Sequence, residues 1–288
     1  MDLSILDFGN IGDAVDLMTE ADRSGYRRYW LGEHHSEWQC GNPLLLGALL
    51  AATSDGIRVG SGGVCLDYHS PYRVAEDARL IEFMLPGRFD LGVTRGLTLA
   101  PELREAMLDG RPADTLRSHS EKLADLHGFL TGRLPAGHPL AQKLPLEPGP
   151  PMWVLGTGEE AARWAGRHGT GFCFSLHHAP AERDGPAILG EYRQAFVPSP
   201  EFPEPAAIVM VSMASGTALG EAPAHAPGVV KPVIEGPVAE CAAKLAEIAR
   251  CFAVDEVMVL LRSYGEWPFE TCRALAEQAG LTPRADPR

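Results

Sequence analysis

The sequence predicts an α/β fold, a (β/α)8 TIM barrel formed by a single domain over residues 1–288. Eight short apolar segments rich in β-branched and aromatic residues alternate with longer segments of helical periodicity. Strands that alternate with helices form a parallel sheet with right-handed crossovers, and eight repeats allow that sheet to close. An open, doubly wound sheet is the alternative, but residues 7–12 lack the full glycine spacing of that fold's first turn.

The predicted strands and the first helix follow one another from the N-terminus. The strands cover residues 3–8, 27–32, 57–66, 88–94, 151–155, 171–176, 206–213 and 256–261. Between the first two strands, apolar residues recur at helical spacing over residues 14–21, and Gly25 ends that helix. Two further helices are predicted where a capping residue precedes a proline, at Asn42-Pro43 and Ser70-Pro71.

The remaining helices are predicted from apolar periodicity. They cover residues 114–130, 158–168, 181–196 with a break near Gly185-Pro186, 237–252 and 268–280. The connections 97–113, 132–150 and 197–236 are irregular. Strand-to-helix connections lie at the catalytic face of a barrel. We therefore expect residues 97–113 and 214–236 to cover an active site.

Composition and charge exclude several classes of function. The formal net charge of −13 argues against a nucleic-acid partner or an anionic membrane surface. The six cysteines form no CxxC pair, and several lie inside apolar runs, which favours a reducing cytoplasm over a disulfide framework. The first residues lack a basic region followed by a long apolar one, and no apolar run is long enough to span a membrane. We therefore predict a cytoplasmic protein without a membrane partner.

Two histidine pairs end predicted strands, where barrel chemistry is located. His34 and His35 follow the second strand, and His177 and His178 follow the sixth. Adjacent strand residues point to opposite faces, so neither pair suits a single metal ion, and we predict no metal site. One histidine of a pair facing the pocket is suited to general acid–base work. The alternative is that these histidines are structural.

Glycines and a cation mark the ends of three other strands. Gly62-Gly63 interrupts the third strand, which indicates either a β-bulge or a close approach of the backbone to a ligand. Arg95 ends the fourth strand between glycines, where its guanidinium suits a phosphate; a surface ion pair is the alternative.

The segment Gly156-Thr157-Gly158 joins the fifth strand to a helix whose first N–H groups suit the same phosphate. Thr157 and Glu160 also match a capping box, which needs no ligand, and Glu159 and Glu160 oppose an anion. In the third helix, Glu76 and Asp77 are interpreted as architectural, with Arg73 and Arg79 as partners.

Several of these motifs, in this order and spacing, resemble the bacterial luciferase-like, flavin-dependent monooxygenases. They are Trp30–His35, Gly41-Asn42-Pro43, Arg58–Val64, His69–Asp77 and Pro86–Gly96. The resemblance covers residues 3–96 closely and continues more weakly through 151–180 and 236–261. It implies a barrel that binds reduced FMN and uses O2 to oxygenate a small organic substrate. It also implies a separate flavin reductase, because no nicotinamide fingerprint is present, and a homodimer.

The resemblance also assigns roles to individual residues. It implies that His34 is catalytic, with His177 in a pocket role, that Gly62-Gly63 carries a cis peptide under the flavin, and that Arg95 binds the flavin phosphate. Luciferases that emit light have a cysteine where this chain has Thr94 and a tryptophan near Leu176, so light emission is not expected. Thr94 remains able to hydrogen-bond the flavin.

Two other functions stay open. One is hydride transfer with the deazaflavin coenzyme by an enzyme of the same superfamily. The other is a non-catalytic, flavin-binding or accessory subunit, against which the presence of both His34 and Arg95 argues. Loops hold the determinants of the substrate, so the sequence does not name it.

Overall fold

The computed structural model describes most of the chain. The described residues are 1–8, 12–35, 39–54, 56–96, 100–112, 115–134, 139–140, 149–180, 184–215, 233–263 and 268–284. Parts of all three predicted irregular connections, including most of 214–236, lie outside the described residues, so their expected covering role stays a prediction.

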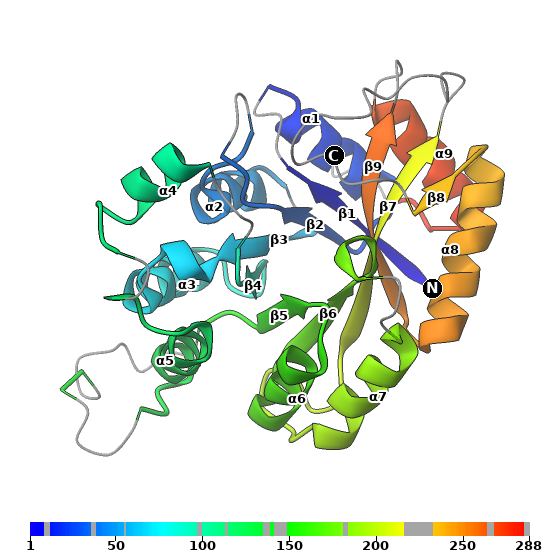
Figure 1. The fold of residues 1–288 in the computed structure, drawn as a ribbon. Coiled ribbons are helices and arrows are strands. Elements are labelled where there is room, and N and C mark those ends of the chain that lie inside the picture. Colours follow the sequence, from blue (N-terminus) through cyan, green and yellow to red (C-terminus); the bar gives the residue numbers. More distant parts are fainter. Residues whose placement is uncertain are drawn as a thin grey trace.

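Eight parallel strands close into a barrel, as the sequence predicts (Figure 1). They are β1 (Asp2–Asp7), β2 (Arg28–Leu31), β3 (Arg58–Cys65), β4 (Phe89–Thr94), β5 (Met152–Gly156), β6 (Gly171–Ser175), β7 (Ala207–Ser215) and β9 (Glu256–Ser263). Strands β1 to β6 pair in sequence order, and β6–β7, β7–β9 and β9–β1 complete the circle. A short strand, β8 (Ile234–Glu235), is added to β7.

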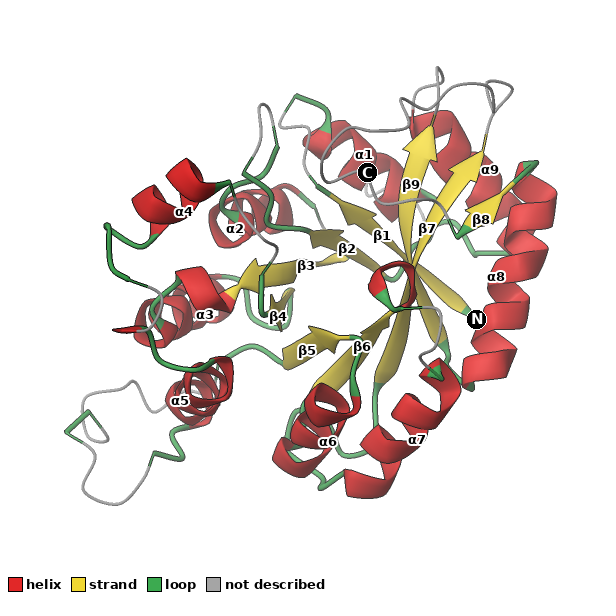
Figure 2. Ribbon diagram, in the orientation of Figure 1, coloured by secondary structure: helices red, strands yellow, loops and turns green. Residues whose placement is uncertain are grey.

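Helices surround the barrel on its outside (Figure 2). They are α1 (Ala14–Arg23), α2 (Pro43–Thr53), α3 (Pro71–Met84), α4 (Pro101–Met107), α5 (His119–Thr131), α6 (Glu159–His168), α7 (Gly185–Ala195), α8 (Val238–Phe252) and α9 (Pro268–Ala279). Two 3-10 turns, η1 (Leu66–Tyr68) and η3 (Leu176–His178), follow β3 and β6. In the part of the chain that is described, no helix is both long and apolar enough to cross a membrane.

Three helix predictions need correction. Helix α5 begins at His119 and not at residue 114, because Ser118 forms a capping box with Glu121. Helix α7 begins at Gly185, where the Asp184 side chain accepts a hydrogen bond from the N–H of Ala187, so the predicted break is the start of the helix. The connection 97–113, predicted to be irregular, contains α4.

The inside of the barrel is filled by two tryptophans that only glycines leave room for. A Cβ on Gly60 would lie 2.7 Å from the Trp30 ring, and one on Gly171 would lie 2.3 Å from the Trp153 ring. The two indoles meet edge to face, with ring centroids 5.9 Å apart. Because real contacts are longer than these Cβ distances, the glycines are required by the packing.

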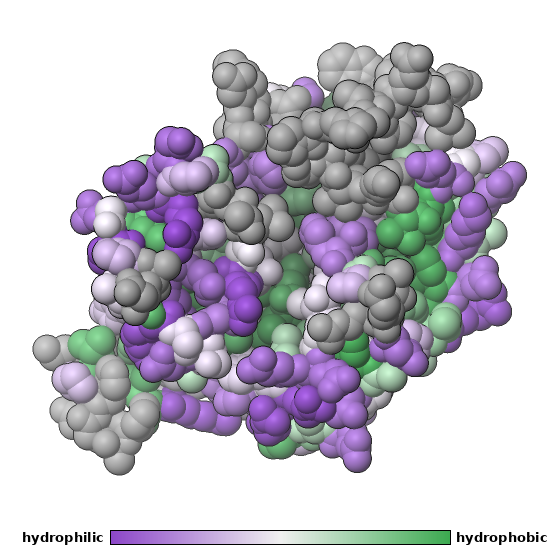
Figure 3. Space-filling model, in the orientation of Figure 1, coloured by the Kyte–Doolittle hydropathy of each residue, from purple (hydrophilic) through white to green (hydrophobic). Residues whose placement is uncertain are grey.

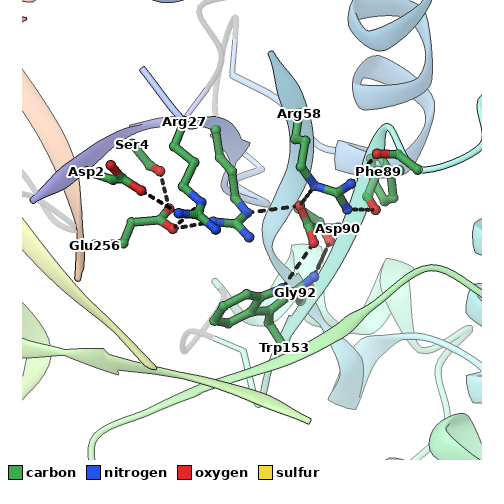
Figure 4. Close-up of polar contacts among 12 residues, drawn as sticks. Asp2, Ser4, Arg27, Arg58, Phe89, Asp90, Gly92, Trp153 and Glu256 are labelled. Carbon is green, nitrogen blue, oxygen red and sulfur yellow. Dashed lines mark hydrogen bonds and ion pairs between the residues drawn. The ribbon is translucent and has the colours of Figure 1, made fainter. Parts of the chain in front are cut away.

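A buried ionic cluster joins the N-terminal ends of six strands (Figure 4). The carboxylate of Asp90 accepts hydrogen bonds from Nε of Arg28 (3.1 Å), Nε of Arg58 (2.7 Å) and Nε1 of Trp153 (3.2 Å). Arg28 also pairs with Glu256, whose carboxylate accepts from the Ser4 hydroxyl. Burial alone would raise the pKa of Asp90, but the charges and hydrogen bonds of Arg28 and Arg58 hold this pKa below its usual value.

The charged residues of α3 behave as predicted in part. Arg73 pairs with Glu76 (2.7 Å) and with Asp77 (3.3 Å) on the exposed surface of the helix. The expectation that Arg79 is a further partner is wrong. Its buried guanidinium donates to the carbonyls of Phe129 and Leu130 at the end of α5, where unpaired helix carbonyls need donors.

We predict that Asp90→Ala lowers the free energy of unfolding by about 3–5 kcal/mol, because Arg28 keeps only Glu256, Arg58 loses its carboxylate, and the Trp153 N–H loses its buried acceptor. Equilibrium urea denaturation measures this change. Glu76→Ala, which removes an exposed ion pair, is the matched control and should cost less than about 1 kcal/mol. Equal losses for the two variants would show that the buried cluster contributes no more than a surface pair.

Candidate functional site

A cavity of about 810 Å³ opens at the C-terminal ends of the strands. Its floor is apolar and comes from the barrel, with Leu6, Val154, Leu155 and Met210 among its residues. Figure 3 shows hydrophobic atoms recessed near the centre of one face, with hydrophilic residues around them. The cavity therefore lies at the end of the barrel opposite the buried ionic cluster.

The cavity brings together seven of the nine residues predicted from the sequence. They are Gly62, Gly63, Thr94, Arg95, Gly156, Thr157 and Gly158. They come from the ends of three strands and from the start of α6, which are distant in sequence. His34 and His177 do not belong to the lining as the described residues define it. The functional roles of all nine residues stay predictions.

The glycine pair in β3 is irregular, as its sequence indicates. The Gly62–Gly63 peptide is cis, and the register between β3 and β4 shifts between Ser61 and Val64. A Cβ on Gly63 would lie 2.8 Å from the Gly92 carbonyl oxygen, and a Cβ on Gly62 would lie 2.9 Å from the Cβ of Trp30. The backbone therefore reaches the cavity at a place where no side chain fits.

Arg95 follows β4 and is exposed at the rim of the cavity. Its carbonyl oxygen accepts a hydrogen bond from the N–H of Asp67 in η1 (3.1 Å). Thr94 is half-buried and lies opposite Cys65 in the β3–β4 register. Cys65 also lines the cavity, so a thiol stands on the neighbouring strand at the level of Thr94.

The connection from β5 to α6 differs from the predicted capping box. Gly158 is the N-cap of α6, and no side chain caps the helix. Glu159 and Glu160 lie in the first turn and line the cavity, where their charge opposes an anion. Arg163, also in the lining, pairs with Glu159 at 3.2 Å and so offsets part of that charge.

Glu33 is a cavity residue that the sequence reasoning did not single out. Its buried carboxylate accepts from the N–H of Cys65 and hydrogen-bonds Nε2 of both His35 and His69, each at 2.8 Å. Burial alone would raise the pKa of Glu33, but these contacts, led by His69, lower it below its usual value. An ionised carboxylate thus joins the end of β2 to the end of β3. The sequence signal that could have identified Glu33 was its position directly before the pair His34-His35.

His34 lies beside the cavity. Its N–H donates to the carbonyl of Cys40 (2.9 Å), and its ring contacts Phe8, a lining residue, with ring centroids 5.5 Å apart. Burial lowers the pKa of His34, the charge of His35 adds to this shift, and a hydrogen bond with Gln39 opposes it. The lowered pKa favours the neutral form of the imidazole.

At the end of β6 the histidine that lines the cavity is His178, whereas the sequence favoured His177. Nδ1 of His178 lies 2.8 Å from the Ser175 hydroxyl, and Ser175 is also in the lining. The rings of His177 and His178 are in contact, with centroids 4.2 Å apart. The two rings meet because residues 176–178 form the 3-10 turn η3. In a strand, the side chains of His177 and His178 would point to opposite faces.

A second histidine of the lining, His119, occupies the first position of α5. Its Nδ1 lies 2.7 Å from a carboxylate oxygen of Asp67. The sequence reasoning missed it because the helix was predicted to start five residues earlier. Recognition of the Ser118…Glu121 capping box would have placed His119 at a helix start facing the ends of the strands.

Comparison with known proteins identifies the family. The model of the luciferase-like monooxygenase family matches residues 4–226. YceB, an uncharacterized protein of Bacillus subtilis, is 39% identical over 203 residues, which are 69% of this chain and 60% of that protein. The N-acetyl-S-alkylcysteine monooxygenase of Bacillus subtilis is 34% identical over 212 residues, 67% of this chain and 61% of that enzyme.

Solved structures share the fold over nearly the whole chain. The crystal structure of apo-MsnO8 has a TM-score of 0.79 and 26% identity, covering 98% of this chain and 99% of that one. The oxygenating component of 3,6-diketocamphane monooxygenase from Pseudomonas putida, solved with FMN, has a TM-score of 0.67 and 15% identity over 97% and 98% of the chains. An F420-dependent secondary alcohol dehydrogenase, solved with an F420–acetone adduct, has a TM-score of 0.68 and 13% identity, covering 96% of this chain and 97% of that one.

The chain spans about three fifths of the length of the curated relatives it matches. The family model nevertheless covers most of the chain, and its matched region contains most of β1, all of β2 to β7 and every cavity residue described above. This chain belongs to the luciferase-like monooxygenase family.

Proposed function

We propose that the protein is a flavin-dependent monooxygenase that uses reduced FMN and O2 to oxygenate a small organic substrate. The observation that carries this proposal is the cavity itself. An apolar floor, a glycine backbone and a rim cation converge there in a chain of the luciferase-like family. The substrate is left open, because parts of the connections expected to cover the cavity lie outside the described residues.

The residues present fit a flavin mononucleotide. A planar, largely apolar ring system suits a floor of aliphatic side chains and a backbone without Cβ atoms at Gly62-Gly63. The phosphate suits the rim that holds Arg95, Thr157 and the first N–H groups of α6. Glu159 and Glu160 oppose the phosphate, and the ion pair of Arg163 with Glu159 reduces that repulsion.

Bound reduced flavin supplies the electrons for the activation of O2. This chain supplies orientation, exclusion of water and proton transfer. The apolar floor excludes water from the reacting centre. His34, kept neutral by burial, accepts a proton at its imidazole nitrogen. Glu33 holds His35 and His69 in fixed orientations beside it.

A titration with three cofactors tests this function. Anaerobic protein is titrated with reduced FMN, oxidised FMN and the deazaflavin coenzyme, and O2 is then admitted to the reduced-FMN complex. We expect tight binding of reduced FMN and, after O2 is admitted, a long-lived oxygenated complex. Arg95→Ala should weaken reduced FMN at least tenfold, about 1.4 kcal/mol for a lost phosphate contact. Arg104→Ala, on exposed α4 outside the cavity lining, is the control and should bind as the unaltered protein does.

Each other outcome of this titration favours a different function. Preference for the deazaflavin would replace oxygenation by hydride transfer. Binding of no cofactor would favour an accessory subunit. Unchanged FMN affinity in Arg95→Ala would remove Arg95 from the phosphate site.

We predict that His34→Ala reduces turnover while flavin binding stays nearly intact, because His34 accepts a proton and does not hold the cofactor. Because the pKa of His34 is lowered, the acid limb of the turnover profile should lie below the usual imidazole range and disappear in the variant. His177→Ala and His178→Ala, measured in parallel, decide which histidine after β6 takes part. Full turnover in His34→Ala would exclude it as the base.

A separate reductase and a second copy of this chain are the proposed partners. The reductase would supply reduced FMN, since no nicotinamide fingerprint is present. The second copy would cover large apolar side chains that α2 and α3 expose side by side: Leu45, Leu49, Leu80, Phe83 and Met84. Arg73 and Asp77 on α3 provide opposite charges that a two-fold axis can pair between copies.

We predict that the protein sediments at twice 31.0 kDa and that Phe83→Glu shifts it towards the monomer. Val15→Glu, on α1, replaces an exposed apolar residue outside this patch and should leave the dimer unchanged. Analytical ultracentrifugation measures all three proteins. A single species near 31.0 kDa in the unaltered protein would exclude the homodimer.

A further inference from the structure

The rim of the cavity holds a histidine that the proposed function does not use. His119 lines the cavity from the start of α5, and its side chain is 15% exposed. Its Nδ1 is held by Asp67 at 2.7 Å, so the other ring nitrogen, Nε2, is the one left for the cavity. A carboxylate on one nitrogen of an imidazole fixes the ring's orientation and so the direction of its other nitrogen.

The turn that carries Asp67 is itself held in place. The ammonium of Lys122, one helical turn after His119, donates to the carbonyls of Leu66 (3.2 Å), Asp67 (2.7 Å) and His69 (3.1 Å). Residues three apart on a helix lie on one face, so His119 and Lys122 grip the same turn. Asp67 also donates its N–H to the carbonyl of Arg95. These contacts set His119 beside Arg95.

This side of the cavity is suited to an anion. Burial lowers the pKa of Lys122, against the opposing charge of Asp67, and the charges of Arg111 and Arg117 lower it further. The ammonium of Lys122, bonded to the carbonyl of Asp67, is a further positive charge on this side. Ser118 and Ser120, which flank His119, add hydroxyl groups to the lining.

We propose that His119, positioned by Asp67, is a second cationic ligand, beside Arg95, for the phosphate monoester of the bound cofactor. This inference rests on the proposed function. The doubly protonated ring donates from Nε2 to a phosphate oxygen and from Nδ1 to Asp67, so it lies between two anions. No bond is made or broken, and one proton is held on the ring while the phosphate is bound.

The comparison of reduced FMN with reduced riboflavin isolates the phosphate. Affinities for both are measured by anaerobic titration. In His119→Ala we expect reduced FMN to bind about tenfold more weakly and reduced riboflavin to bind unchanged, because only the charge-assisted contact to the phosphate is lost. Equal weakening of both flavins would mean that His119 only supports the fold, and would overturn the proposal.

Asp67→Ala distinguishes positioning from bulk charge by the sign of its effect. Removal of a carboxylate near a phosphate should tighten FMN if charge alone matters. If Asp67 orients His119, the same change should weaken FMN. Asp125→Ala removes a carboxylate from α5, the helix of His119, where Asp125 pairs with Arg117 outside the cavity lining; it is the matched control with no expected change. Tighter FMN binding in Asp67→Ala would overturn the positioning role.

Nitrogen-15 NMR of the histidine rings gives a readout that needs no activity and no flavin chemistry. We expect inorganic phosphate and FMN, but not riboflavin, to shift the ring-nitrogen signals of His119. If the protein binds no flavin, the proposed function fails, yet a response of His119 to inorganic phosphate would still support the anion site. If FMN binds and the His119 signals do not respond, the proposed function stands and this inference fails.

Discussion

The buried carboxylate of Asp90 is the interaction on which the arrangement of the barrel depends. It accepts from Arg28, Arg58 and Trp153, and Arg28 continues the cluster to Glu256 on the strand that closes the circle. These charges stabilise one another only while the N-terminal ends of the strands stay together, because a buried guanidinium without its carboxylate is costly. One end of the barrel is thereby filled and fixed, and the cavity is confined to the other.

Glycine determines the shape of that cavity. Gly60 and Gly171 leave space for the indoles that fill the middle of the barrel, and Gly62-Gly63 brings bare backbone to the cavity floor. A close-packed interior transmits such constraints, so the position of each indole fixes where the floor lies. The floor is consequently rigid and apolar, whereas the polar groups come from the turns and helices at the rim.

At the rim of the cavity, two carboxylates each orient histidine side chains. Glu33 joins β2 to β3 as an anion that orients two histidines, and Asp67 orients His119 on the side where Arg95 lies. In both cases a carboxylate fixes an imidazole, which is how a protein sets the direction of a histidine's remaining nitrogen. The family membership of the chain is consistent with a flavin in this cavity.

The sequence by itself determined the barrel and the strand ends at which the site lies, because alternating apolar periodicity and glycine or proline boundaries are local signals. The positions of Arg95 and Gly62-Gly63 at the cavity were predictable for the same reason, since each ends or interrupts a strand. Only the tertiary structure decided that His178 and not His177 lines the cavity, since η3 replaces the end of a strand there. Only the tertiary structure joined Asp67 to His119 and Glu33 to His69, because residues 52 and 36 apart in sequence meet where neighbouring elements pack around the end of β3.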